Sequence, residues 1–206
     1  AAYSQIDHES ETNLDKDLGP YERPRVFCAS LADVFDNEVD PAWRADLFKL
    51  IGATPNLTWL LLTKRVGNAH QMIGESLIRI AGGTDLLPTW PWPNVWLGAT
   101  VINQAEADRD IPKLLAVPAR VRFLSIEPML GPVDLRGAAI DWGIVGGESG
   151  PNARPMHPDW ARSIRDQCQA AGVPFHFKQF GEYLCDNIPD DFTGAHANCI
   201  DFLGRD

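Results

Sequence analysis

The most distinctive chemical feature of the sequence is a glycine-rich segment from Gly146 to Gly150, with Arg154 four residues beyond it. Glycines let a backbone approach a ligand closely, and their amides can cradle an anion. Glu148 could accept a hydrogen bond from an amine or a ribose hydroxyl, and Arg154 could hold a carboxylate or a phosphate. The segment matches neither a Walker A loop nor the Gly-x-Gly-x-x-Gly fingerprint. We expect a binding role for Gly146, Gly147, Glu148, Ser149 and Arg154, with a tight turn carrying a surface glutamate as the alternative.

Basic residues directly follow two other apolar runs of the sequence. Lys64 and Arg65 come after one run, and Lys178 comes after another, with Gln179 next to it. An ammonium or a guanidinium at such a position can meet an anionic ligand. We expect Lys64, Arg65 and Lys178 to meet negative charge at one common edge; ordinary surface cations are the alternative.

A serine and a glutamate flank Ile126 where a further apolar run ends. Alternation along a strand places Ser125 and Glu127 on the same face. Glu127 could act as a general base or bind a ligand, or it could form an ion pair with a lysine or arginine. Glu127 and Lys178 are therefore the candidate catalytic residues. Weaker candidates follow other runs, namely Ser30, Asp33 and Thr100.

Several classes of site are not supported by the sequence. There is no Gly-x-Ser-x-Gly elbow to anchor a hydrolase triad. The close mixed group of Cys185, His196 and Cys199 lacks the paired spacing of a zinc site, so we expect no metal site. A formal net charge of −10 argues against generic binding of duplex DNA through a basic surface.

Localisation follows from cysteine usage and from the absence of long apolar stretches. The four cysteines are too dispersed to form a disulfide framework, which favours reduced thiols and a cytoplasmic protein. No apolar stretch approaches the roughly 20 residues of a membrane span, so we expect no membrane partner.

The elements that must position these residues are six short apolar runs, separated by helix-like segments or loops. Buried parallel strands are near-continuous apolar runs, and the chemistry of α/β barrels lies where such strands end. The runs predict strands near 25–29, 58–62, 95–99, 121–125, 142–146 and 174–178. We expect an α/β fold, a partial (β/α) barrel of about six parallel strands with outer helices; a doubly wound sheet is the alternative. The predicted domains are an arm at 1–24, the barrel at 25–184 and a tail at 185–206.

Local signals predict where the helices begin and end. Asp40 and Pro41 indicate a start and Gly52 a stop. A second helix is expected from about Asn68 to Gly82, and Asn103 with Glu106 forms a capping box. A last helix is expected from Pro158 to Gly172. Trp90 and Trp92 lie in a proline-rich loop and are expected to cover an edge of the core; a stacking surface for a base is the alternative.

Six motifs, in order, resemble a phage-associated family of uncharacterised proteins that itself resembles radical S-adenosylmethionine (SAM) enzymes. The resemblance spans about residues 24–184, and its motifs are Val26–Asp36, Leu62–Arg65, Asn94–Gly98, Phe123–Pro128, Gly146–Gly150 and Phe177–Gln179. It implies a partial (β/α) barrel whose rim holds cofactor and substrate. The rim residues would be Ser30, Asp33, Lys64, Arg65, Ser125, Glu127, Glu148, Ser149, Arg154, Lys178 and Gln179.

The resemblance also implies a cofactor segment that differs here. Full-length members resemble radical SAM enzymes in carrying, before the first matched strand, cysteines that would hold a 4Fe–4S cluster, to which SAM would bind. This sequence has no cysteine before Cys28. We therefore expect no cluster, and no radical chemistry, on this chain alone.

Together these features predict a phage- or prophage-type protein with a radical-SAM-like barrel. It would bind a SAM- or nucleotide-like small molecule at the carboxyl-terminal rim of its strands. One alternative is a non-catalytic module that binds a ligand or a protein. Another is a metal-independent hydrolase or transferase that uses Glu127 or Glu148 with Lys178. A homodimer could cover the open strand edges of an incomplete barrel.

Overall fold

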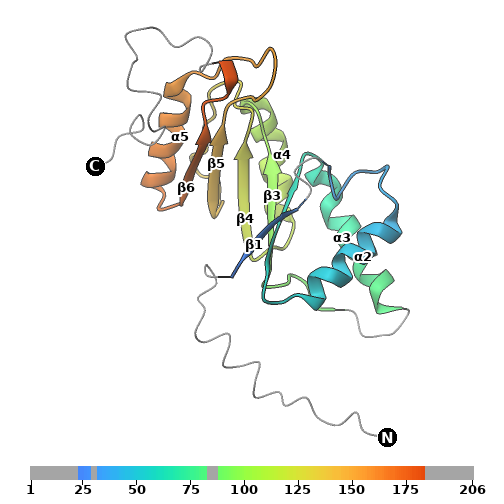
Figure 1. Ribbon diagram of the computed structural model, residues 1–206. Coiled ribbons are helices and arrows are strands. Elements are labelled where there is room, and N and C mark those ends of the chain that lie inside the picture. Colours follow the sequence, from blue (N-terminus) through green and yellow to red (C-terminus); the bar gives the residue numbers. More distant parts are fainter. Residues whose placement is uncertain (1–22, 29–31, 83–87, 184–206) are drawn as a thin grey trace, which may run out of the picture.

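The computed structural model describes residues 23–28, 32–82 and 88–183, which form one curled sheet with helices on its outer side (Figure 1). The strands are β1 Arg25–Cys28, β2 Thr58–Thr63, β3 Val95–Thr100, β4 Val121–Ile126, β5 Trp142–Gly146 and β6 Phe175–Gln179. The helices are α2 Pro41–Ala53, α3 Val66–Ala81, α4 Gln104–Ala116 and α5 Pro158–Ala170. The predicted arm, apart from its last two residues, and the predicted tail lie outside the described residues.

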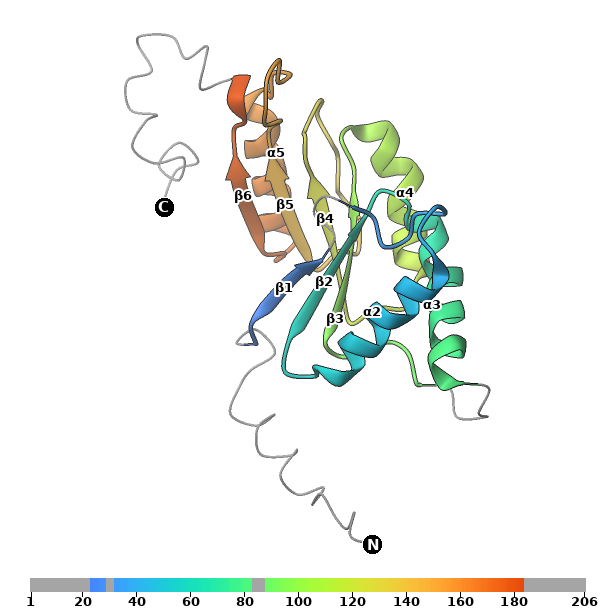
Figure 2. The same cartoon turned by 45° about the vertical axis from the view of Figure 1, so that its right-hand side comes forward.

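All neighbouring strands pair in parallel, in the order β1-β2-β3-β4-β5-β6. A doubly wound sheet would reverse its strand order at a switch point, and this sheet does not. Figure 2 shows the sheet curling so that β1 and β6 form the two free edges of a half-barrel. The predicted α/β fold, a partial barrel of six parallel strands, is therefore confirmed.

The main core lies between the sheet and the helices. Alternate strand residues point to this side, and Leu61, Leu97, Leu124 and Val145 are fully enclosed there. Burial of an apolar side chain of this size stabilises a fold by about 1.5–3 kcal/mol. Both faces of the middle strands are covered, which explains why their sequences are continuously apolar rather than alternating.

A second, smaller cluster covers the inner face of the sheet. It consists of Leu60, Trp96, Phe123 and Ile144. The ring of Phe123 lies over Gly98 on the neighbouring strand, where a Cβ atom would be 2.3 Å from it. The middle of the inner face is thus filled, and open space remains towards the two ends of the strands.

Side chains cap the helices largely as predicted. Asp40 accepts a hydrogen bond from the backbone N–H of Ala42 at 2.8 Å, and Asn103 accepts one from Glu106 at 3.0 Å. Gly82 ends α3 in the left-handed conformation with φ 63°. Two predicted boundaries are wrong: α3 begins at Val66 rather than near Asn68, and α2 continues through Gly52 to Ala53.

The tryptophans before β3 cover the edge of the core, as predicted. The rings of Trp90 and Trp92 lie 6.0 Å and 5.8 Å from that of Phe48, and the indole N–H of Trp90 donates to the carbonyl of Pro118. Both rings are partly buried against the core. No helix in the described part of the chain is long and apolar enough to span a membrane.

Candidate functional site

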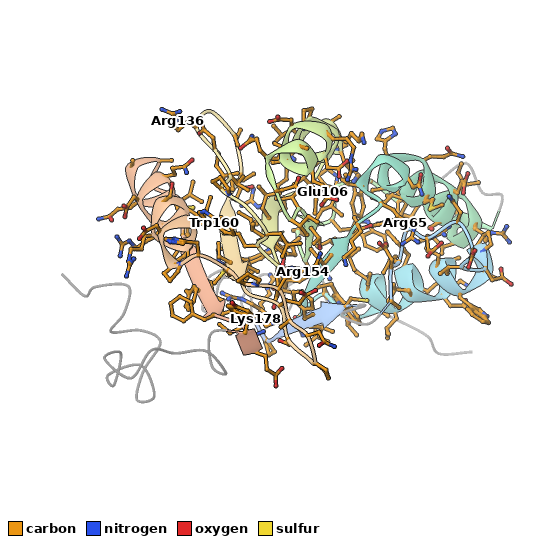
Figure 3. All side chains as sticks on the ribbon, turned by 90° about the horizontal axis from the view of Figure 1, so that it is seen from above. Arg65, Glu106, Arg136, Arg154, Trp160 and Lys178 are labelled. Carbon is orange, nitrogen blue, oxygen red and sulfur yellow. The ribbon has the colours of Figure 1, made fainter. Side chains whose placement is uncertain are left out.

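The predicted site residues that the structure describes lie at or just beyond the carboxyl ends of the strands. Figure 3 looks from above onto this rim, with Arg154 and Lys178 near its middle and Arg65 further towards α3. Parallel pairing brings the strand ends to one edge, which is why residues far apart in the sequence meet here. Ser30 lies outside the described residues.

The centre of the rim is an ion pair between β4 and β6. The Nζ atom of Lys178 lies 2.8 Å from Oε1 of Glu127, and their side chains are 53% and 22% exposed. Glu127 follows the last residue of β4, and Lys178 lies on the exposed side of β6. The two candidate catalytic residues are therefore in direct contact, and the pair is open to solvent.

A glycine leaves space beside this pair. A Cβ atom at Gly146 would lie 3.0 Å from Oε1 of Glu127, closer than side-chain carbons normally approach. Any other residue at the end of β5 would push against the carboxylate. Gly146 thus allows Glu127 to lie against β5 and face Lys178.

Two hydroxyl groups lie on the inner face below the ion pair. Thr100 and Ser125 are partners in the β3–β4 register, and Ser125 shares its face with Glu127. Neither hydroxyl makes a hydrogen bond within the described residues, although both side chains are largely buried. No enclosed side-chain oxygen or nitrogen in this part of the chain lacks a partner, so both hydroxyls keep access to the inner space. Both hydroxyls can therefore still form hydrogen bonds.

The glycine-rich segment packs against the chain that follows β6. The N–H of Gly147 donates to the carbonyl of Gln179 at 2.9 Å, and a Cβ atom at Gly147 would lie 1.8 Å from the carbonyl oxygen of Phe180. The side-chain amide of Gln179 donates to the hydroxyl of Ser149 at 2.5 Å. The N–H of Gly150 is occupied by the carboxylate of Glu182. The close approach that Gly147 permits is therefore to the protein's own backbone.

Glu148 and Arg154 bind each other. Nε and a terminal nitrogen of Arg154 lie 2.8 Å and 2.5 Å from the two carboxylate oxygens, and the backbone N–H of Arg154 donates to the same carboxylate at 2.7 Å. These hydrogen bonds lower the pKa of Glu148 to about 2. The two side chains bridge the loop after β5.

Asp33 and Arg65 form a second closed arrangement where β1 and β2 end. Asp33 accepts hydrogen bonds from the hydroxyl of Thr63 at 2.7 Å and from the backbone N–H of Lys64 at 2.9 Å. Arg65 contacts Asp33 at 3.5 Å and Asp36 at 2.9 Å. The Lys64 side chain is exposed and forms no ion pair with a described residue, so it stays available to an anion.

The two described cysteines lie on different elements. Cys28 is half-buried at the end of β1, and Cys168 is buried on α5. Burial raises the pKa of both thiols, which favours their protonated form. Within the described ranges, no group of three or more His, Cys, Asp or Glu residues could hold a metal ion. The group of Cys185, His196 and Cys199 lies outside those ranges.

Sequence reasoning did not identify Asp36 and Glu182 as partners of rim residues. Asp36 pairs with Arg65 across the β1–β2 connection, and Glu182 binds the amide of Gly150. Neither carries a local sequence signal, because each contact depends on how two loops meet in space.

Comparison with known proteins identifies a family and nothing further. Residues 2–201 match the sequence model of a protein family, DUF5131, whose description is 'protein of unknown function'. No curated protein and no solved structure shows significant similarity to the chain.

Proposed function

The chain belongs to the DUF5131 family, and we propose that its half-barrel binds a small nucleoside-like ligand with a zwitterionic group, such as S-adenosylmethionine, at the carboxyl-terminal rim. The observation that carries this proposal is the solvent-exposed Glu127–Lys178 pair, with the hydroxyls of Thr100 and Ser125 on the same inner face and without a hydrogen bond to any described residue. The expected phage-type setting and cytoplasmic location are further proposals, based on the sequence resemblance and the dispersed cysteines.

An open ion pair can recognise a ligand that carries both charges. An α-carboxylate would take the place of Glu127 against the Lys178 ammonium, and an α-ammonium would take the place of Lys178 against the Glu127 carboxylate. Lys178 then exchanges one carboxylate for another, and Glu127 exchanges one ammonium group for another. Neither side chain is left as an unpaired charge. Surface pairs contribute only about 0–1 kcal/mol to stability, so opening this one costs the fold little.

The hydroxyls of Thr100 and Ser125 favour a ligand with hydroxyl groups of its own. Each hydroxyl can donate one hydrogen bond and accept two, and neither makes one within the described residues. A ribose presents vicinal hydroxyls that match two neighbouring groups of this kind. Lys64, exposed beyond β2, adds a cation for a ligand that carries a phosphate.

If the rim also catalyses a reaction, Glu127 is the better candidate base. Both oxygens of Glu148 are bound by Arg154, and a pKa of about 2 makes its carboxylate a weak base. A metal-independent transferase or hydrolase would therefore depend on Glu127 with Lys178, and Glu127→Gln would abolish its turnover while Glu148→Gln would not.

Cluster chemistry is not part of the proposal. The described part of the chain holds two cysteines, Cys28 and Cys168, which lie on different elements. What the described residues offer is binding and orientation of the ligand.

Calorimetric titration tests the proposal. We expect S-adenosylmethionine to bind to the purified chain and Lys178→Met to weaken it at least about tenfold, because the carboxylate loses a charge-assisted hydrogen bond. Lys49→Met is the matched control, since Lys49 is an exposed lysine on α2, and it should leave the affinity unchanged. No measurable binding, or equal affinities for all three proteins, would reject the rim as the site.

A further inference from the structure

A second concave site lies at the opposite, amino-terminal end of the strands. It is a cavity of about 450 Å³, formed where β1, β3, β4, β5 and β6 begin. Its lining includes Arg25, Trp96, Arg120, Trp142 and His176. Closed barrels fill this end with packed side chains. Here the half-barrel leaves the inner face open, and aromatic and cationic groups line the space.

Two tryptophans and an arginine form the inner wall of this cavity. The indole rings of Trp96 and Trp142 meet edge to face with centroids 6.1 Å apart. The guanidinium of Arg25 lies over both rings, 5.1 Å and 5.9 Å from their centroids. Such stacking uses the flat face of the guanidinium and leaves the N–H groups at its edge free to bind an acceptor.

Three polar side chains that face the cavity are donors to which no described residue offers an acceptor. Arg25 and Arg120 form no hydrogen bond and no ion pair with any residue in the described ranges, and the indole N–H of Trp142 makes no hydrogen bond there. The one carboxylate in the lining, Asp141, accepts the backbone N–H of Arg122 at 2.7 Å. On a chain with a net charge of −10, two unpaired guanidinium groups at one cavity are a local exception.

We propose that this cavity binds an organic anion with a flat aromatic ring, as in an aryl phosphate or a mononucleotide. The acidic group would accept hydrogen bonds from Arg25 and Arg120, whose planar donors match phosphate and carboxylate geometry. The ring would pack against the half-exposed Trp142. The volume of about 450 Å³ falls within the usual range of small-molecule pockets. This site is separate from the rim and does not depend on the function proposed there.

Calorimetric titration with 1-naphthyl phosphate tests the proposal. We expect one molecule to bind per chain, and we expect Arg25→Gln and Arg120→Gln each to weaken binding at least about tenfold. The neutral analogue 1-naphthol should bind at least about tenfold more weakly than the phosphate, because it cannot accept charge-assisted hydrogen bonds. Arg136→Gln is the matched control, since Arg136 is exposed and pairs with Asp134 away from this cavity.

Two further variants separate this site from alternatives. Lys178→Met, at the rim, should leave the affinity for 1-naphthyl phosphate unchanged; an equal loss would place the anion at the rim and overturn the proposal. Arg25→Lys keeps the charge but loses the planar fork, and it should bind more tightly than Arg25→Gln and more weakly than the unmodified chain. No binding, or binding that survives both Arg→Gln changes, would also overturn the proposal. Arg120 is exposed. The affinity of the Arg120→Gln protein therefore tests the proposal even if a change at Arg25 disturbs the fold.

Discussion

At the scale of single residues, the carboxylates of the rim differ by what already holds them. Glu148 is bound on both oxygens by Arg154, and Asp33 is bound by Thr63 and the Lys64 backbone. Glu127 has one ammonium partner and space beside Gly146. The sequence identified all three as candidates, because residue type and position after a strand are visible in it. It places Asp33 below the two glutamates, but it does not separate Glu127 from Glu148 as a base, because that depends on which partner each one meets.

The ion pair with Arg154 determines the pKa of Glu148. A carboxyl whose pKa is lowered on folding stabilises the fold above its unfolded pKa, and this contribution is lost as the pH falls from about 4.5 towards about 2. We expect Arg154→Gln to return the pKa of Glu148 towards 4.5, measured by carbon-detected NMR titration of the side-chain carboxyl. Arg136→Gln is the control: it should raise the pKa of Asp134, which is also about 2, and leave the pKa of Glu148 unchanged. A Glu148 pKa that stays near 2 without Arg154 would contradict this account.

We expect Asp33 to stabilise the folded state. Its side chain is 10% exposed and joins the end of β1 to the end of β2. Asp33→Ala should lower the free energy of unfolding by about 2–4 kcal/mol, because a buried hydroxyl and a backbone N–H lose a charged acceptor. Asp46→Ala removes an exposed ion pair with Lys49. This substitution should change the free energy of unfolding by less than about 1 kcal/mol. Urea denaturation measures both. Equal stability of the Asp33→Ala protein and the unmodified chain would leave ligand binding as the role of Asp33.

At the scale of elements, strands were easier to predict than helix ends. Short apolar runs locate all six strands to within a residue or two. The middle strands are continuously apolar because both of their faces are covered, whereas the edge strands β1 and β6 alternate in exposure. The start of α3 was missed because its N-cap, Arg65, makes no side-chain capping bond, so the sequence carries no capping signal there. Gly52 predicts a stop, yet α2 continues to Ala53, and the backbone N–H of Thr54 donates to the carbonyl of Ile51.

Substitution by alanine should have opposite effects on stability at two glycines in different elements. At Gly98 on β3 a Cβ atom would lie 2.3 Å from the buried ring of Phe123, so Gly98→Ala should destabilise the fold by about 1–3 kcal/mol. At Gly74 in α3 nothing lies within 4 Å of the added carbon, so Gly74→Ala should stabilise it by roughly 0.5–1 kcal/mol. Thermal unfolding followed by circular dichroism compares them. A Gly98→Ala protein at least as stable as the unmodified chain would mean that the ring of Phe123 does not pack on the inner face as described.

At the scale of the whole molecule, an incomplete barrel has an inner face that is closed in the middle and open at both ends. Phe123 and its neighbours fill the middle, the ion pair and hydroxyls face one end, and the tryptophans and arginines face the other. The sequence predicted the rim, since strand ends are visible in it. It did not predict the amino-terminal cavity, because Arg25, Trp96 and Trp142 look like ordinary strand residues until the sheet curls. The expected homodimer stays a prediction, supported by the free edges of β1 and β6.

The most direct test of the central claim is a map of amide chemical shifts in the nitrogen-labelled chain as S-adenosylmethionine is added. The account predicts the largest changes at Thr100, Ser125, Glu127, Gly146 and Lys178, with the amides of Arg25, Arg120 and Trp142 unchanged. An absence of changes at saturating ligand, or changes confined to the amino-terminal end of the strands, would contradict binding at the carboxyl-terminal rim.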